Sequence, residues 1–105
     1  MSLSGLNKQP FDKKQFDPES LATRWGQRGF SCDLWVDPPG QKWEDYVHDV
    51  DEVVYVMEGT LEFEIGDKKQ ILKPGDETFV LSGTNHSVRN IGGTVARWYY
   101  GYKKH

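Results

Sequence analysis

The chain has 105 residues, of which 36% are hydrophobic, and it carries a formal net charge of −3. This length leaves room for one folded domain. The acidic balance lacks the basic surface with which proteins bind nucleic acids or anionic membranes, so we expect neither partner. The longest apolar run, residues 53–57, is too short to cross a bilayer, and no signal peptide is apparent. Cys32 is the one cysteine, which excludes an intrachain disulfide and favours a reducing, cytoplasmic location.

The N-terminal quarter is expected to form an arm ahead of the folded domain. Its first 15 residues are polar and show no periodicity. The order Asp17, Pro18, Glu19 then predicts the start of a short helical segment, because Asp caps free N–H groups, Pro fits the first turn and Glu is favourable at the positive helix end. Glycines soon end this segment. We therefore divide the chain into an arm at 1–27 and a folded domain at 28–105.

Beyond the arm, the pattern predicts short strands separated by turns that contain glycine. Apolar and polar residues alternate over 30–37, an apolar run fills 53–57, and alternation returns at 61–65. Later segments of the same kind lie at 71–72, 78–81, 86–91 and 94–102. About eight short strands with turns every 8–12 residues are typical of a sandwich or small barrel. We therefore predict an all-β fold.

The alternation also predicts which side chains are buried. In the strand at 61–65, the apolar side chains should face the core and the acidic ones the solvent, because successive strand residues point to opposite faces. The two sets are Leu61, Phe63 and Ile65 on one face and Glu62 and Glu64 on the other. Cys32 shares the parity of Leu34 and Val36, so we expect a buried, unreactive thiol.

The last expected strand is rich in aromatic residues. Trp98, Tyr100 and Tyr102 fall on one of its faces, and Arg97 and Tyr99 fall on the other. If one face packs inside the fold, the opposite face exposes large side chains. Exposed aromatic surface is typical of an interface, and a small chain without disulfides gains stability from additional burial. We therefore expect a homodimer.

Three histidines, His48, His86 and His105, are the first candidates for chemistry. His48 stands four residues before Glu52, just ahead of the apolar strand, and His86 opens a later strand. A barrel can bring two strand starts together. Two imidazoles and one carboxylate form the facial set that holds non-haem iron(II) with open positions for substrate. Taken singly, a histidine at a strand end is more often a surface or hydrogen-bonded residue.

Residue spacing adds a second signal. Two runs of fixed positions occur, Gly40-x5-Tyr46-x-His48-x3-Glu52-x6-Gly59 and Gly75-x5-Leu81-x-Gly83-x2-His86-x3-Asn90. Their intervals resemble both sequence motifs of the cupin superfamily, and eight of the ten fixed positions match. The two departures are Tyr46, which stands in place of the first motif histidine, and Leu81, which stands in place of a turn proline.

The resemblance implies a double-stranded β-helix, the jelly-roll barrel of the cupin type, over residues 28–102. It also implies that His48, Glu52 and His86 bind one divalent metal ion, whose remaining positions hold water or substrate. This ligand set accepts iron, manganese, nickel, zinc or copper, so the identity of the metal stays open. The motif glycines are expected at turns that need positive φ, and Asn90 is expected to cap or bridge a turn with its amide.

Tyr46 has three interpretations. It could be a fourth metal ligand, held as a phenolate by the charge of the metal, or a catalytic acid, base or hydrogen-bond donor beside a bound water. It could also be a core aromatic in a protein that has lost its metal. Since a phenol titrates at about pH 10, its neutral form is a poorer ligand than imidazole. Its position one residue away from His48 gives both side chains the same strand parity, so we expect Tyr46 to point inward, near the metal.

Two functions follow from this resemblance. The first is a metal-dependent enzyme of the oxygenase, isomerase or lyase class that acts on a small organic molecule. The second is a binding or scaffold cupin without turnover that has partly or wholly lost its metal site. Both imply a small-molecule ligand, and small cupins commonly pair as dimers. The open space beside the metal position discriminates between them, because a lost site would be filled by side chains.

Overall fold

The computed structural model describes residues 11–104, in which one helix precedes eight strands. The elements are α1 (Pro18–Gln27), β1 (Asp33–Asp37), β2 (Lys42–Tyr46), β3 (Glu52–Glu58), β4 (Leu61–Ile65), β5 (Lys68–Leu72), β6 (Glu77–Val80), β7 (His86–Asn90) and β8 (Ala96–Tyr102). Within the described range, no helix has the length and hydrophobicity that a membrane span requires. Most of the expected arm's first 15 residues, and His105, lie outside the described residues.

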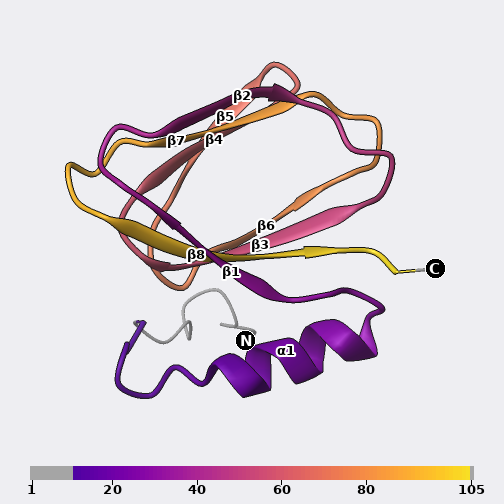
Figure 1. The fold of residues 1–105 in the computed structure, drawn as a ribbon, viewed down its shortest axis with the longest axis vertical. Helices are drawn as coiled ribbons and strands as arrows, with labels where there is room; N and C mark the ends of the chain where they lie inside the picture. Colours follow the sequence, from indigo (N-terminus) through magenta and orange to yellow (C-terminus); the bar gives the residue numbers. More distant parts are fainter. Residues whose placement is uncertain (1–10, 105) are drawn as a thin grey trace, which may run out of the picture.

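The strands form two antiparallel sheets that face each other, as Figure 1 shows. One sheet has the order β1-β8-β3-β6 and the other the order β2-β7-β4-β5. The strands of each sheet are therefore brought together from distant parts of the sequence, which is the arrangement of a jelly roll. The predicted all-β jelly-roll fold is confirmed. Both sheets contribute strand ends to the same end of the barrel, which is how residues far apart in sequence meet.

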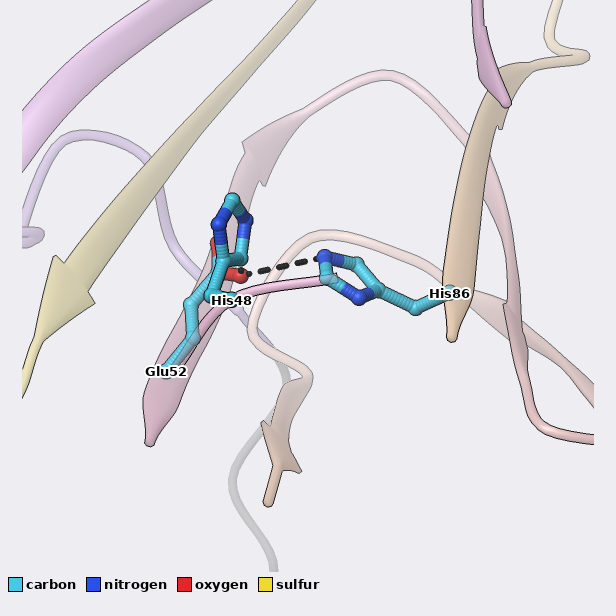
Figure 2. Close-up of side chains that lie close together, drawn as sticks. All are labelled: His48, Glu52 and His86. Atoms are coloured by element: carbon cyan, nitrogen blue, oxygen red, sulfur yellow. Dashed lines mark ion pairs between the residues drawn. The ribbon is translucent and has the colours of Figure 1, made fainter. Parts of the chain in front are cut away.

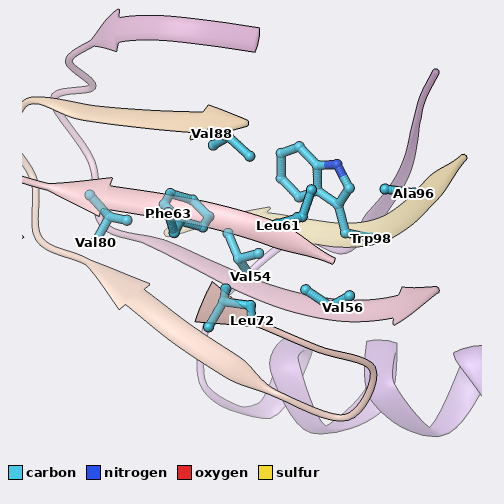
Figure 3. Close-up of a cluster of buried hydrophobic side chains, with 9 residues drawn as sticks. All are labelled: Val54, Val56, Leu61, Phe63, Leu72, Val80, Val88, Ala96 and Trp98. Carbon is cyan, nitrogen blue, oxygen red and sulfur yellow. The ribbon is translucent and has the colours of Figure 1, made fainter. Parts of the chain in front are cut away.

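The core between the sheets consists of nine buried side chains (Figure 3). They are Val54, Val56, Leu61, Phe63, Leu72, Val80, Val88, Ala96 and Trp98. In β4, Leu61 and Phe63 are fully buried and Ile65 is half-buried at the edge of the core, so the predicted inner face is confirmed. The two acidic side chains of β4 point away from this core but are half-buried rather than exposed, because each lies 2.9 Å from the guanidinium of Arg89.

Helix α1 closes the outer face of the β1-β8-β3-β6 sheet (Figure 1). The helix begins as expected, because the Asp17 carboxylate accepts a 3.1 Å hydrogen bond from the backbone N–H of Glu19. Leu21 and Trp25, one turn apart, are both completely buried against the sheet. Burial of side chains of this size contributes about 1.5–3 kcal/mol each, so the packing of α1 is a large part of what stabilises this face.

This packing overturns the expected exposure of the outer face of the last strand. Tyr99 is 8% exposed and lies in one cluster with Trp25 and Phe30, and Phe16 packs against it with ring centroids 5.6 Å apart. The aromatic side chain that we expected at an interface is therefore covered by the chain's own helix and the segment before it. The pattern of residues 97–102 does not reveal this cover, because the helix that supplies it comes from the segment expected to form a separate arm.

In β1 the face expected to be buried is exposed, and the buried residue of the strand, Asp37, lies on the other face. Leu34 and Val36 are 46% and 47% exposed, whereas Asp37 is 1% exposed. Cys32 is half-buried beside the helix cluster rather than buried in the barrel core. Burial and then the neighbouring Asp33 raise the pKa of its thiol, which agrees with the expectation of an unreactive cysteine.

Strand β2 is the strand that the sequence pattern did not predict. Its pairing with β7 shifts register between Trp43 and Tyr46, and between them Asp45 adopts a φ of 58°. The backbone N–H of Asp45 donates a 2.9 Å hydrogen bond to the Ser87 hydroxyl. Because this bulge inserts an extra residue, Trp43 and Tyr46 both line the interior although they are three positions apart. A period of two is therefore absent from this segment.

Candidate metal and ligand site

A cavity of about 270 Å³ opens between the two sheets. Ten side chains line it: Trp35, Trp43, Tyr46, His48, Glu52, His86, Val88, Trp98, Tyr100 and Tyr102. They come from β1, β2, β3, β7 and β8 and from the loop before β3. Six of the ten are tryptophan or tyrosine, and none is lysine or arginine. The cavity is therefore an aromatic chamber whose polar groups are concentrated at the histidines and the glutamate.

His48, Glu52 and His86 converge on one point in this cavity (Figure 2). One ligand atom from each lies within 4.8 Å of the others. Glu52 Oε1 is 3.6 Å from His48 Nε2 and 3.3 Å from His86 Nε2. Among residues 11–104, this is the group of three such side chains that could hold a metal ion. Glu52 and His86, the first residues of β3 and β7, are both buried.

Backbone hydrogen bonds tie the loop that carries His48 to the turn that precedes His86. The carbonyl of His48 accepts a 2.7 Å hydrogen bond from the N–H of Gly83. The Asp51 carboxylate accepts a 2.8 Å hydrogen bond from the N–H of Ser82. Gly83 has a φ of 80°, in the left-handed region that favours glycine. The two motif segments are thus held against each other by their backbones, independently of any bound ion.

The donor set fits a cation. Glu52 Oε1 is buried and has no hydrogen-bond partner. His86 Nε2 lies 3.3 Å away and carries no proton in the neutral ring. A buried acceptor left without a donor costs about 1–3 kcal/mol, and a metal ion would remove that cost. His86 Nδ1 lies 3.1 Å from the Thr84 carbonyl oxygen. This contact places the ring proton on Nδ1 and leaves the Nε2 lone pair free to bind a metal.

The charge of Glu52 also sets the protonation of its neighbours. Burial by itself lowers the pKa of His86, but the nearby Glu52 carboxylate and the Thr84 carbonyl outweigh it, so the pKa is raised overall. Burial, with Glu52 and Tyr100 adding to it, raises the pKa of Tyr102 to about 12. The pKa of Tyr100 is also raised, by burial and then by Asp33 and Glu52. Both phenols therefore stay protonated at neutral pH.

Tyr46 lies at the exposed side of this group. It lines the cavity and is 42% exposed. Its ring centroid is 6.4 Å from that of His48, and it pairs with His86 across the β2–β7 ladder. Tyr46 is therefore beside the three candidate ligands, in a position to contact a molecule that enters the cavity.

A buried carboxylate behind the aromatic wall was not foreseen from the sequence. Asp37, at the end of β1, accepts three indole N–H hydrogen bonds. Trp35 and Trp43 donate to its Oδ1 at 2.9 and 3.0 Å, and Trp98 donates to its Oδ2 at 3.0 Å. The one available signal was that Trp35 and Asp37 share a strand face. The other two tryptophans come from β2 and β8, so only the fold brings them together.

Asn90 bridges the loop that follows Asp37 to the turn before β8. Its Nδ2 donates to the carbonyl oxygens of Pro38 at 3.0 Å and Thr94 at 2.8 Å, and its Oδ1 accepts from the N–H of Gly92 at 3.2 Å. The expected bridging role of this amide is therefore observed. By fixing the start of the loop after β1, Asn90 also fixes the position of the buried carboxylate.

Comparison with known proteins agrees with this architecture. The family model described as Cupin domain matches residues 33–102. The protein TT1209 from Thermus thermophilus superposes with a TM-score of 0.65 at 29% sequence identity, over 72% of this chain and 74% of that one. The cupin domain of Schizosaccharomyces pombe Cnp3 superposes with a TM-score of 0.68 at 19% identity, over 73% of this chain and 57% of that one.

A recombinant oxalate oxidase in complex with glycolate has the same fold, with a TM-score of 0.67 at 22% identity. The superposition covers 73% of this chain but 43% of the oxidase chain. At identities this low, the likeness to the oxidase and to the Cnp3 domain shows the fold alone. No sequence among curated proteins matches the chain significantly. The family model nevertheless spans two thirds of the chain and the whole of the barrel, and the chain therefore belongs to the cupin family.

Proposed function

We propose that this protein is a metal-dependent enzyme that acts on a small organic molecule, with one divalent metal ion held by His48, Glu52 and His86. The observation that carries the proposal is the buried Oε1 of Glu52, which lies between two imidazole nitrogens and has no hydrogen-bond donor. A metal bound there would supply Lewis-acid polarisation of a substrate oxygen or activation of dioxygen. Iron, manganese, nickel, zinc and copper all suit the donor set.

The residues around the three ligands would bind and orient the substrate. The Thr84 carbonyl keeps Nε2 of His86 available. The hydroxyl of Tyr102 lies 3.4 Å from His48 Nε2, so it stands beside the group of candidate ligands. Tyr46, exposed at the side of the cavity, is proposed as the catalytic acid, or as the hydrogen-bond donor to the substrate.

Elemental analysis of protein purified without a histidine tag tests the metal. The expected result is about one divalent ion per chain, since three protein ligands suffice for a catalytic site. The variant His86→Ala should lose the ion. The matched control is His105→Ala, which removes a histidine that the proposal does not use and should retain it. Equal metal content in the two variants would contradict the proposed ligand set.

A binding or scaffold cupin without turnover is the second candidate. Tyr46 in place of the first motif histidine favours it, because the ligand set is then one imidazole short of the family pattern. The cavity favours the enzyme, since about 270 Å³ beside the candidate ligands remains open. The variant Tyr46→His discriminates between them. A scaffold that has lost its metal should bind the ion only in the variant, where the added imidazole completes the ligand set, whereas the proposed enzyme should bind the ion in the wild type as well.

The homodimer and the cytoplasmic location stay predictions. The covered face of β8 removes the original reason to expect a dimer, but the edge strand β1 still exposes Leu34 and Val36. Light scattering should give twice the 12.1 kDa chain mass if the protein pairs. A mass near that of the single chain at micromolar concentration would contradict the prediction.

A further inference from the structure

The aromatic rings at the β1 side of the cavity meet at steep angles. The rings of Trp35 and Trp43 have centroids 5.8 Å apart and an interplanar angle of 71°. Trp35 and Tyr100 are 6.2 Å apart at 78°, and Trp98 and Tyr100 are 6.0 Å apart at 58°. Such walls form a corner. A corner surrounds a compact, rounded group, whereas a flat ligand is held best between two parallel faces.

Asp37 fixes the orientation of this corner. Its two oxygens accept three indole N–H groups. The indole N–H edges are thereby turned toward a side chain that is 1% exposed. No N–H of these three tryptophans remains for an anionic ligand. Donation to a carboxylate also leaves more electron density on the indole rings, which strengthens their attraction for a cation.

The charged side chains around the cavity also favour a cationic ligand over an anionic one. Its lining includes the Glu52 carboxylate, has the Asp37 carboxylate behind it, and contains no lysine or arginine. In the described part of the chain, the ion pairs of Glu52 are with histidines alone. A carboxylate or phosphate ligand would find no basic side chain at this end. At the β1 end of the cavity, a positively charged group would meet several π faces with the Asp37 side chain behind them.

We propose that the corner formed by Trp35, Trp43 and Tyr100 binds a methylated ammonium group, so that the ligand of this protein is a small organic cation. Aromatic rings attract such groups without the cost of stripping a tightly held hydration shell. The corner and the candidate metal ligands belong to one cavity. If the proposed function holds, the other end of the cation carries an oxygen group that reaches the metal, and this last clause rests on that proposal.

Choline and its uncharged carbon isostere, 3,3-dimethylbutan-1-ol, provide a matched pair of probes. They have the same shape and the same hydroxyl, so a difference in affinity reports the charge. Calorimetric titration should show saturable binding of choline. The affinity for the isostere should be lower than that for choline by roughly tenfold or more. Sodium chloride at the same concentration serves as the ionic control. Equal affinity for the two probes, or no saturable binding of choline, would overturn the proposal.

The tryptophan side chains supply an internal control for the location. Three of the four indoles surround Asp37, whereas Trp25 donates its N–H to Glu77 at 3.3 Å outside the cavity. In ¹⁵N-correlated NMR spectra, choline should shift the indole N–H signals of Trp35, Trp43 and Trp98 and leave that of Trp25 in place. Equal shifts of all four signals, or shifts of Trp25 alone, would place the binding elsewhere and refute the corner.

Two substitutions of Trp43 should lower choline affinity to different extents. Trp43→Phe keeps a weaker π face and Trp43→Leu removes it, so choline affinity should fall in that order, by about tenfold for leucine. Phe79→Leu, an exposed aromatic outside the cavity, is the control and should bind choline like the wild type. Circular dichroism confirms that each variant is folded. Unchanged affinity in a folded Trp43→Leu variant would contradict the proposal.

The same titration, repeated after metal removal with EDTA, separates this inference from the proposed function. Choline binding to metal-free protein would support the corner even if elemental analysis finds no metal. Metal bound by the three ligands without choline binding would refute the corner and leave the proposed metal centre intact. The two proposals can therefore fail independently.

Discussion

The β1-β8-β3-β6 sheet carries aromatic side chains on both faces, and the two faces are used differently. On the outer face, Trp25 and Tyr99 are packed into a closed cluster beneath α1. On the inner face, Trp35 and Tyr100 line an open cavity. The same strand, β8, supplies both faces through its alternation, with Tyr99 pointing out and Tyr100 pointing in. Residue type alone therefore does not decide whether an aromatic group stabilises the fold or forms a site.

What differs is the way in which the rings are held. The outer rings are held by tight packing, and Trp25 is completely buried. The inner tryptophans leave space between them, and their orientation depends on hydrogen bonds to the single carboxylate of Asp37. A buried anion that fixes three indole edges can keep a cavity open where packing would close it. The outer cluster thus contributes mainly to stability, whereas binding is the role that we propose for the inner cluster.

The largest effect is expected when the outer cluster is broken. Trp25→Ala should lower the free energy of unfolding by about 3–5 kcal/mol, because it removes a fully buried ring and leaves a cavity beneath α1. Urea denaturation measures the change. Arg24→Ala, at an exposed neighbouring position, is the matched control and should change stability little. A cost below about 1 kcal/mol would mean that the helix contributes little to the fold.

A smaller loss is expected when the inner cluster loses its carboxylate. Asp37→Ala leaves three indole N–H groups without their acceptor, and we expect a loss of about 2–3 kcal/mol, because water in the open cavity can satisfy some of them. Asp33→Ala, at an exposed position of the same strand, is the control. The indole signals of the three cavity tryptophans should shift or broaden, while that of Trp25 stays. Unchanged stability and unchanged spectra would refute the role given to Asp37.

Strict alternation made β4 predictable, because a period of two with one apolar face permits one inward orientation. The bulge at Asp45 hid β2, since it places Trp43 and Tyr46 on the same side at a spacing that no regular strand has. In β1, both faces contain apolar residues. Alternation alone could not tell which one faces inward, and the residue that is buried is the carboxylate of Asp37.

The helix contact and the site were predictable to different degrees. Leu21 and Trp25 are four residues apart, the spacing of one helix face, but nothing in that spacing says which sheet they cover. The three candidate metal ligands could be predicted because each occupies a fixed position in a motif. His48 and Glu52 lie in the first motif, and His86 lies in the second. Asp37 had no such position, since its partners come from three different strands. Sites encoded within short segments are therefore readable from the sequence, and sites assembled across strands are not.

The smallest expected effect, and the one whose sign changes with pH, concerns Glu52 in metal-free protein. Its buried oxygen lacks a donor at pH 8, where His86 carries less positive charge. Replacing the charge with an amide in Glu52→Gln should therefore raise the free energy of unfolding by about 1 kcal/mol at about pH 8. The same variant should lose metal binding, so stability and function would change in opposite directions.

At lower pH this advantage should disappear. The pKa of His86 is raised in the folded protein, so protonated His86 stabilises the fold below its unfolded pKa of about 6.5, and the contribution is lost as pH rises through the folded value. Glu52→Gln removes the carboxylate that favours this charge, so the wild type should equal or exceed the variant in stability at about pH 5.5. Urea denaturation in the presence of EDTA at both pH values measures the difference. Glu62→Gln, whose carboxylate pairs with Arg89 on the outside of the barrel, should show no such reversal. If Glu52→Gln changes stability equally at both pH values, Glu52 does not control the protonation of His86.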